Sequence, residues 1–296
     1  HKSMLFTIVV QQPPTIKVPS VCKTIRQAVL RLAGLPQGRV VVEPGNYFEE
    51  ETISVQNQVS IIGTGSVTIT CLAKTLFQLN GNALLFRLNC VVSEDADDQS
   101  ECISVLGGSP VIAMCNVTSK VGTGIALDKN SSTMMLATNI QNGHGHGIDV
   151  APGATAVLVK CEVSGNKGIG VFATDCLLYI TDTIFFKNNS TGLLMAYPKS
   201  DCTVSDCIFS GNAGIGVSVR NEAFADFSGN ILTDNAGGGL DIESGAKGSF
   251  FKNHIFANKT HGTRVEDAGE GISFKGNITQ HHAEDSVFKW LSSTRE

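Results

Sequence analysis

Two groups of residues in this sequence carry side chains that could do chemistry. The first lies in residues 142–149, where His144 and His146 alternate with glycines and Asp149 follows. Histidine and carboxylate groups can transfer protons, ligate a metal or contact a ligand. Two histidines at positions i and i+2 are a weak metal signal, so we expect no metal and no cofactor. The remaining interpretations are a turn position for His146 and a sugar or peptide contact through His144, His146, Asp149 and Lys167.

The second group is charged and is divided between two segments that are 23 residues apart. Asp241 and Glu243 occupy the first segment, and Arg264, Glu266 and Asp267 occupy the second. If these segments form neighbouring parallel strands, Asp241 faces Arg264 and Glu243 faces Glu266, each about 4.8 Å apart. The group is then either a solvated surface with one weak ion pair or an acidic patch for a basic partner or a cation.

The elements that position these groups are indicated by an internal repeat. A glycine followed by an apolar residue, any residue and a second apolar residue recurs about every 23 residues. Its glycines are Gly124, Gly147, Gly168, Gly192, Gly214, Gly239 and, in a weaker copy, Gly262. Small polar residues with the same period form a second series: Cys115, Asn139, Cys161, Thr183, Cys207, Asn230, Asn253 and Asn277. Two series with one period predict stacked copies of a single structural unit.

Each unit alternates apolar and polar residues, a pattern typical of short strands. A repeat of about 23 residues leaves no room for a crossover helix of ordinary length, and the leucine framework of leucine-rich repeats is absent. We therefore predict an all-β fold, a right-handed parallel β-helix (solenoid) of about ten coils of about 23 residues each. Asparagines stacked at equivalent corners would form an internal ladder of hydrogen bonds.

A solenoid needs a cap at each end, and the sequence offers a candidate for both. Residues 24–33 predict an amphipathic helix that ends at Gly34. Ala283 to Ser292 could form a short helix at the other end. We divide the chain into four parts: a leader, in part a cloning remnant, with a first strand (1–23), the N-terminal capping helix (24–35), the parallel β-helix (36–280) and the C-terminal helical cap (281–296).

The middle residue of the repeated motif points outward, because its apolar neighbours point into the core. The outward residues are Ser104, Ala126, Asp149, Gly170, Leu194, Gly216, Asp241 and Arg264. The two carboxylates of this series, Asp149 and Asp241, are four coils or roughly 19 Å apart, which is too far to act on one glycosidic bond. A face of mostly small residues favours ligand contact over acid–base chemistry, so we expect no catalytic residues.

Composition limits the possible partners and compartments. The net charge of −5, without a basic stripe, argues against nucleic acid, and no apolar run approaches the ~20 residues of a membrane span. Nine cysteines, an odd number, indicate reduced thiols and an intracellular protein. Cys115, Cys161 and Cys207 should lie ~9.6 Å apart in succession, beyond disulfide reach, whereas a bond between Cys202 and Cys207 stays open. Six glycosylation triplets favour a secreted protein as the alternative: Asn116, Asn130, Asn188, Asn189, Asn258 and Asn277.

Several stretches resemble known families. Arg39–Tyr47 and Val59–Gly65 resemble the opening of pectin-lyase-like β-helices of the CASH type. Gly211–Val217 resembles the repeats of the β-helical F-box proteins and of the SHC SH2-domain-binding protein family, which includes Nessun Dorma. The SHC-binding resemblance implies a cytoplasmic partner of the cytokinetic midbody with affinity for carbohydrate.

The Gly-His-Gly sequence within residues 143–147 resembles a motif of polygalacturonases, in which carboxylates on preceding coils accompany the histidine. Here the preceding residues 122–127 contain no carboxylate. We therefore predict a non-catalytic binding scaffold with a protein partner, a glycan partner or both. The alternatives are a polysaccharide-active hydrolase, lyase or epimerase, and the substrate-binding β-helix of an F-box ubiquitin ligase.

Overall fold

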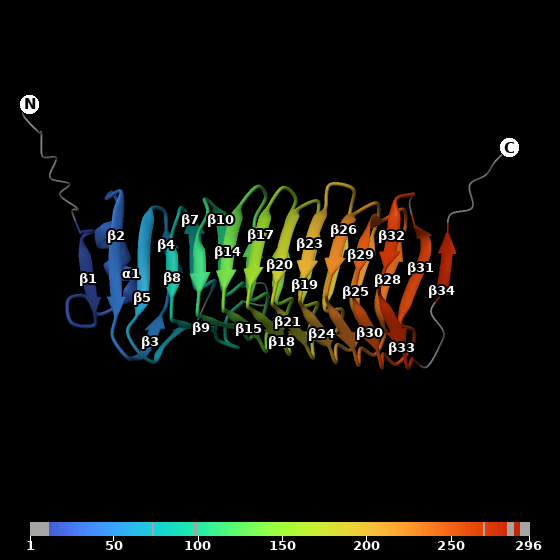
Figure 1. Cartoon of the computed structure of the whole chain (residues 1–296). Helices are drawn as coiled ribbons and strands as arrows, with labels where there is room; N and C mark the ends of the chain where they lie inside the picture. The colour runs from blue at the N-terminus through green and yellow to red at the C-terminus, as the bar shows by residue number, and fades with distance from the viewer. Residues whose placement is uncertain (1–11, 73, 98–99, 269, 283–286, 291–296) are drawn as a thin grey trace, which may run out of the picture.

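The computed structural model describes residues 12–72, 74–97, 100–268, 270–282 and 287–290. Over these residues the chain forms a right-handed parallel β-solenoid of about 11 turns, which confirms the predicted fold. Three parallel sheets run along the rod, seen in Figure 1 with its N-terminal end at the left. The described residues contain one helix, α1 (Ile25–Leu32), and it is neither long nor apolar enough to span a membrane.

Each turn contributes one strand to each sheet. Sheet A has twelve strands, in spatial order β1 (Thr15–Val18), β2 (Gln37–Val42), β5 (Gln58–Gly63), β8 (Leu84–Phe86), β11 (Val111–Ala113), β14 (Ser132–Leu136), β17 (Thr155–Val159), β20 (Leu177–Thr181), β23 (Asp201–Ser205), β26 (Phe224–Ser228), β29 (Lys247–Phe251) and β32 (Ile272–Lys275).

Sheets B and C have eleven strands each. Sheet B consists of β3 (Gly45–Glu49), β6 (Val67–Cys71), β9 (Asn89–Val92), β12 (Asn116–Ser119), β15 (Asn139–Gln141), β18 (Glu162–Ser164), β21 (Ile184–Phe186), β24 (Ile208–Ser210), β27 (Ile231–Thr233), β30 (His254–Phe256) and β33 (Ile278–Gln280). Sheet C consists of β4 (Ile53–Val55), β7 (Phe77–Asn80), β10 (Ile103–Gly107), β13 (Ile125–Leu127), β16 (Ile148–Val150), β19 (Val171–Thr174), β22 (Leu193–Ala196), β25 (Ile215–Arg220), β28 (Gly238–Glu243), β31 (Thr263–Ala268) and β34 (Val287–Trp290).

The core is a single apolar column, because strands of all three sheets turn alternate side chains inward. Equivalent residues of successive turns stack on one another along it. The rings of Phe185 and Phe209 lie parallel with centroids 4.5 Å apart, and those of Phe227 and Phe250 lie 5.7 Å apart. Burial of this apolar column, including its stacked aromatic rings, is the main stabilising contribution to the rod.

A ladder of polar side chains, buried except for the half-buried last member, follows the corner between sheets A and B. Its members are Cys115, Thr138, Cys161, Thr183, Cys207, Asn230, Asn253 and Asn277. Each member after Cys115 accepts a hydrogen bond from the backbone N–H of the member before it, as between Asn253 Oδ1 and Asn230 N at 3.0 Å. One predicted member is wrong: Thr138, not Asn139, lies in the ladder, and Asn139 points outward from sheet B to bond Asn116.

A second ladder, which the sequence analysis missed, follows the corner between sheets B and C. It consists of Asn166, Asn188, Asn212, Asn235 and Asn258. These asparagines are almost completely buried, and each amide nitrogen donates to the amide oxygen of the next at 2.9 to 3.0 Å. Their spacings of 22, 24, 23 and 23 residues were the available signal. Asn188 and Asn258 also belong to glycosylation triplets, and burial leaves no room for a glycan on either.

The repeated glycines lie where adjacent turns approach most closely. The aligned positions are Gly124, Gly147, Gly170, Gly192, Gly216, Gly239 and Gly262. A Cβ atom at any of the first six would lie 2.4 to 2.7 Å from the carbonyl oxygen of the next glycine. The prediction was wrong at Gly168 and Gly214, each two residues early, because the Gly-Ile-Gly sequences there contain two glycines and only the second packs against the next turn.

Helix α1 caps the N-terminal end of the core. Thr24 is its N-cap residue, and its side chain accepts a hydrogen bond from the Gln27 N–H. The carboxylate of Glu49, on β3, accepts a second bond from the Ile25 N–H at 2.7 Å. Glu49 is only 3 % exposed, and burial raises its pKa although the backbone N–H groups of Ile25 and Arg26 act in the opposite direction.

The C-terminal end differs from the prediction. Val287–Trp290 forms β34, which pairs with β31 in parallel and extends sheet C by one more strand. The predicted helix over Ala283–Ser292 is therefore wrong at these four residues, and its other positions lie outside the described residues. An unpaired strand edge favours an added strand over a helix, because backbone groups at the edge of β31 then gain hydrogen-bond partners.

All nine cysteines are buried and carry free thiols, including Cys202 and Cys207. Burial raises the pKa of Cys115 to about 11 and that of Cys207 to about 12. These thiols are therefore weak nucleophiles and serve as small packing groups.

The amide ladder should make a large contribution to stability. Asn212→Ala removes an amide that bonds Asn188, Asn235 and the Phe185 carbonyl, so we expect a loss of about 2–4 kcal/mol in the free energy of unfolding. Urea denaturation followed by circular dichroism measures the change. The matched control is Asn139→Ala, which breaks one outward amide bond and should cost less than about 1 kcal/mol. Equal losses in the two variants would contradict the role of the ladder.

The Glu49 carboxylate should make stability depend on pH. Glu49→Ala leaves the Ile25 N–H without an acceptor and should cost about 1–2 kcal/mol, whereas Glu49→Gln retains an oxygen. Because the pKa is raised in the folded protein, the stabilisation by the protonated form is present below the ordinary value of 4.5 and is lost as pH rises through the folded-state pKa. The stability of the wild type relative to Glu49→Gln should therefore fall as pH rises from 4.5, and an unchanged difference would refute this.

Candidate functional site

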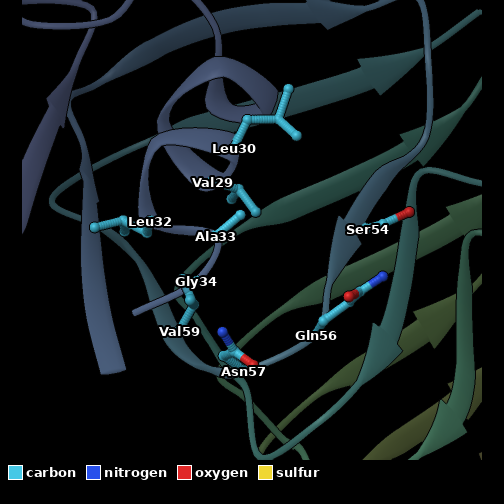
Figure 2. A pocket seen from close by; sticks show the side chains of 9 residues that line it. All are labelled: Val29, Leu30, Leu32, Ala33, Gly34, Ser54, Gln56, Asn57 and Val59. Atoms are coloured by element: carbon cyan, nitrogen blue, oxygen red, sulfur yellow. The ribbon is translucent and has the colours of Figure 1, made fainter. Parts of the chain in front are cut away.

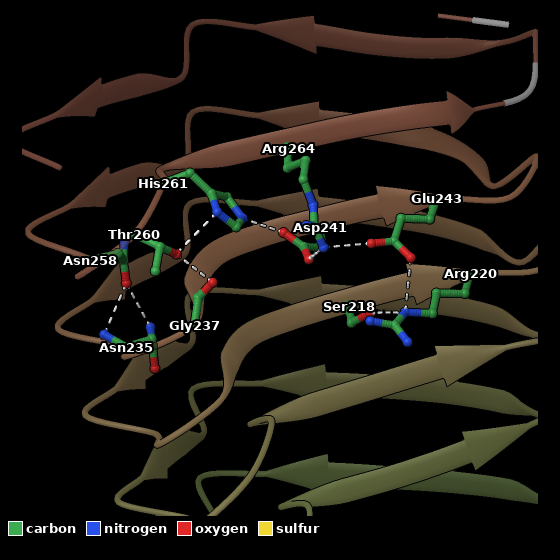
Figure 3. Close-up of polar contacts among 10 residues, drawn as sticks. All are labelled: Ser218, Arg220, Asn235, Gly237, Asp241, Glu243, Asn258, Thr260, His261 and Arg264. Carbon is green, nitrogen blue, oxygen red and sulfur yellow. Dashed lines mark hydrogen bonds and ion pairs between the residues drawn. The ribbon is translucent and has the colours of Figure 1, made fainter. Parts of the chain in front are cut away.

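The charged residues predicted near the C-terminal end converge on the outer face of sheet C. Strands β25, β28 and β31 lie side by side there, and Ser218, Asp241 and Arg264 occupy one row across them. Figure 3 shows these residues with Arg220, Glu243 and His261 in one network. We call these six residues the sheet C charge cluster. Glu243 faces Glu266 on β31, so the predicted pairing between the two segments is the one observed.

Asp241 is the centre of this cluster. One of its carboxylate oxygens contacts His261 Nε2 and the other contacts an Arg264 guanidinium nitrogen. The hydroxyl of Thr260 donates to the Gly237 carbonyl at 2.6 Å, so towards His261 Nδ1, 3.1 Å away, it can only accept. Thr260 and Asp241 therefore hold the His261 ring through both of its nitrogen atoms.

Burial of Asp241 differs from expectation. It projects from the outer side of the strand, as predicted, but its side chain is 0 % exposed, because His261 and Arg264 cover it. The interpretation as a solvated surface with one weak ion pair is therefore wrong for this residue. An exposed ion pair contributes little to folding stability. Loss of either partner of the buried Asp241 carboxylate would strongly destabilise the folded protein, because it would leave a buried charge without a full set of partners.

Arg264 joins the two carboxylates of β28. Its guanidinium donates to Glu243 at 2.6 Å as well as to Asp241. Burial alone would lower the pKa of Arg264, but the negative charges of Asp241 and Glu243 outweigh it and raise the pKa. Glu243 is held from the other side by Arg220 Nε at 3.4 Å, which also donates to Ser218 at 2.7 Å. Opposite charges in the cluster therefore neutralise one another.

The predicted group around His144 and His146 is only partly assembled. His146 Nδ1 accepts a hydrogen bond from the Ile169 N–H at 3.0 Å, and its ring lies 5.4 Å from that of Phe172. Asp149 is half-buried, and burial raises its pKa although nearby His146 acts in the opposite direction. His146 and Asp149 therefore share one part of sheet C. His144 is exposed at the adjoining corner.

Lys167, the fourth residue of the predicted contact set, corresponds in position to His144 and not to His146. The residue equivalent to His146 in the next turn is Ile169, because both precede an aligned glycine by one residue. Lys167 therefore corresponds to His144, and both side chains are exposed at the corner between sheets B and C. The two-residue shift is the same one that misplaced Gly168.

The observed outward row of sheet C differs from the predicted row at two positions. Phe172 and Ser218 occupy the places predicted for Gly170 and Gly216. The row runs Ser104, Ala126, Asp149, Phe172, Leu194, Ser218, Asp241 and Arg264. Asp149 and Asp241 still lie four strands, or roughly 19 Å, apart. The correction adds an aromatic side chain beside Asp149.

A separate hollow of about 170 Å³ lies at the other end of sheet C, between α1 and β4. Figure 2 shows the apolar side chains of Val29 and Leu30 on the helix side and the polar ends of Ser54, Gln56 and Asn57 opposite. No pattern in the sequence indicates this hollow, because it arises from the packing of the cap. Among the described residues, no three or more His, Cys, Asp or Glu side chains are arranged to hold a metal ion.

Comparison with solved structures shows the same fold in proteins of several kinds. The A-module of a mannuronan C-5 epimerase from Azotobacter vinelandii is 14 % identical, with a TM-score of 0.62 over 92 % of this chain and 94 % of that one. The Dettilon tailspike protein is 11 % identical, with a TM-score of 0.70 over 92 % and 68 %. A pectate lyase is 14 % identical, with a TM-score of 0.55 over 81 % and 70 %. At these identities the likeness extends to the fold alone.

No curated protein sequence matches the chain significantly. The family described as right handed beta helix region matches twice, over residues 52–198 and 123–279. Together these matches span the turns from β4 to the end of β33 and include both groups of candidate residues. The chain therefore belongs to the right-handed beta helix family.

Proposed function

We propose that this chain is a non-catalytic binding scaffold and that its ligand surface is the outer face of sheet C. The observation that carries the proposal is the state of Asp241, whose two carboxylate oxygens are both occupied by protein partners. A general acid, a general base or a nucleophile needs a free atom directed at the substrate. Asp241 has none.

The nearby Glu243 does not restore a catalytic pair. Asp241 and Glu243 project from the same side of β28, and pairs of carboxylates about 5–10 Å apart do cleave glycosidic bonds. Here one guanidinium group, that of Arg264, contacts both carboxylates and occupies the place of a scissile bond. The arrangement therefore favours a fixed charge pattern over bond cleavage.

The middle of the same face supports contact with an extended ligand. Phe172 and His146 present aromatic rings next to the half-buried Asp149. The small side chains of Ser104 and Ala126 in the preceding turns leave the surface beside them unobstructed. Aromatic rings flanked by hydrogen-bonding groups suit the apolar faces and hydroxyl groups of sugars. A linear glycan is therefore the first ligand to test, and two of the structurally similar proteins are named as a mannuronan epimerase and a pectate lyase.

A protein partner is the other form of the proposal. The resemblance of Gly211–Val217 to SHC-binding and Nessun Dorma repeats would imply a cytoplasmic partner at the midbody, and the F-box resemblance would imply a ubiquitin-ligase substrate. Nine free, buried thiols agree with an intracellular location. Affinity capture from a cell extract, followed by mass spectrometry, tests these assignments alongside a glycan array.

Catalysis should be absent with acidic polysaccharides. We expect the wild-type chain to produce no unsaturated ends, reducing ends or epimerised residues from polygalacturonate or polymannuronate. Ultraviolet absorbance, a reducing-sugar assay and proton NMR measure the three products. Turnover that disappears in Asp241→Asn, with the fold retained by circular dichroism, would instead establish the enzyme alternative.

Binding should depend on the middle of sheet C. For any glycan that binds on the array, Phe172→Ala should weaken affinity about tenfold, because it removes a stacking surface. Calorimetry measures the change, and His146→Ala with Asp149→Asn extends the test to the polar groups. The matched control is Phe186→Ala, which removes an exposed aromatic ring from sheet B. Unchanged binding in the sheet C variants would remove this face from consideration.

A further inference from the structure

A second hollow, of about 210 Å³, lies at the corner between sheets A and B, in the N-terminal half of the rod. Side chains from three successive turns line it: Ser66 from the first, Arg87 and Asn89 from the second, and Met114 and Asn116 from the third. We call these five residues the corner hollow. They belong neither to the sheet C charge cluster nor to the middle of sheet C.

The hollow exists because one corner is longer than those that follow. Three residues, Thr64 to Ser66, connect β5 to β6, whereas two residues connect β8 to β9 and β11 to β12. The extra residue raises one wall above the turn that carries Arg87. Pro44 supports this wall from the preceding turn, because a Cβ atom at Gly65 would lie 2.8 Å from its ring. The wall is therefore a built feature of the backbone.

Arg87 brings an uncompensated positive charge to the hollow. It lies at the corner position with φ 55° and is exposed, and its guanidinium lies over the Phe86 ring at 5.1 Å. Stacking on the ring leaves the in-plane N–H groups available. Among the residues that the structure describes, no carboxylate forms an ion pair with it.

The amides beside Arg87 also present donors. Asn116 accepts a hydrogen bond at its oxygen from Asn139, and its amide nitrogen has no protein partner among the described residues. Asn89 uses its nitrogen to bond Thr68, which fixes the side chain beside Arg87. Ser66 adds an exposed hydroxyl. The hollow therefore combines one cation with neutral hydrogen-bonding groups, an arrangement that suits an anion carrying hydroxyl groups.

We propose that the corner hollow binds the carboxylate of an acidic sugar residue, with Arg87 pairing the carboxylate and Asn116 donating to a ring oxygen or hydroxyl. Its volume is below the roughly 300–1,000 Å³ of pockets for drug-sized ligands and fits a single sugar ring. The half-exposed Met114 provides an apolar side for the C–H face of that ring. The proposal is independent of the ligand of sheet C, since the two surfaces share no residue.

The test is a titration of the full chain with galacturonate trisaccharide at low ionic strength, followed by NMR or calorimetry. Saturable binding is expected, and Arg87→Gln should weaken it about tenfold or more. The matched control is Lys160→Gln, which removes one positive charge from the same kind of corner, with φ 54°, but outside the hollow. Asn116→Asp keeps the acceptor for Asn139 while replacing the donor by a negative charge, and should weaken binding at least as much as Arg87→Gln.

Comparison ligands separate the possible sources of an effect. Neutral galactose trisaccharide should bind at least tenfold more weakly, because it lacks the carboxylate. Equal weakening by Arg87→Gln and Lys160→Gln, absence of saturation, or equally tight binding of the neutral sugar would each overturn the proposal. If acetate binds as tightly as the acidic trisaccharide, the assignment to a sugar is wrong. Failure here leaves the sheet C proposal unaffected, since Phe172→Ala reports on that face alone.

Discussion

The spacing between successive turns determines which residues can occupy each buried position of this molecule. Because each strand lies one hydrogen-bonded spacing, about 4.8 Å, from its equivalent, every buried position must be compatible with a copy of itself. Phenylalanines meet this condition by stacking, asparagines by donating amide to amide, and glycines by allowing a backbone approach that a Cβ atom would block. The same condition places Asp241 beside Arg264 without any loop to bring them together.

Much of the fold was predictable because this condition leaves a periodic trace in the sequence. The stacked coils of short strands and the N-terminal helix follow from period and amphipathicity, whereas the right-handedness follows from the general preference of connections between parallel strands. Register was less certain. In Gly-Ile-Gly sequences two glycines compete for one close contact, and only the packing shows that Gly170 and Gly216 make it. Asn139 similarly stood next to the buried position that Thr138 occupies, since both are small and polar.

The candidate sites show where sequence reasoning stops. Facing pairs across strands were correct, because register determines them. The burial of Asp241 was not predicted. It depends on His261, whose side chain reaches Asp241 from the corner just before β31. The hollows at α1 and around Arg87 depend on the packing of a cap and on one extra residue in a corner. Neither leaves a pattern with the period of the repeat, so no count of spacings reveals them.

The two corner ladders change character along the rod, and this has a mechanical consequence. From Asn166 to Asn277 amide side chains join successive turns, whereas the corner between sheets A and B from Cys115 to Cys207 uses thiols and hydroxyls, which are weaker partners. Neighbouring turns are thus coupled more strongly in the C-terminal half. Under tension or heating, turns of the N-terminal half should therefore separate first. The sheet C charge cluster lies in the more strongly coupled C-terminal half.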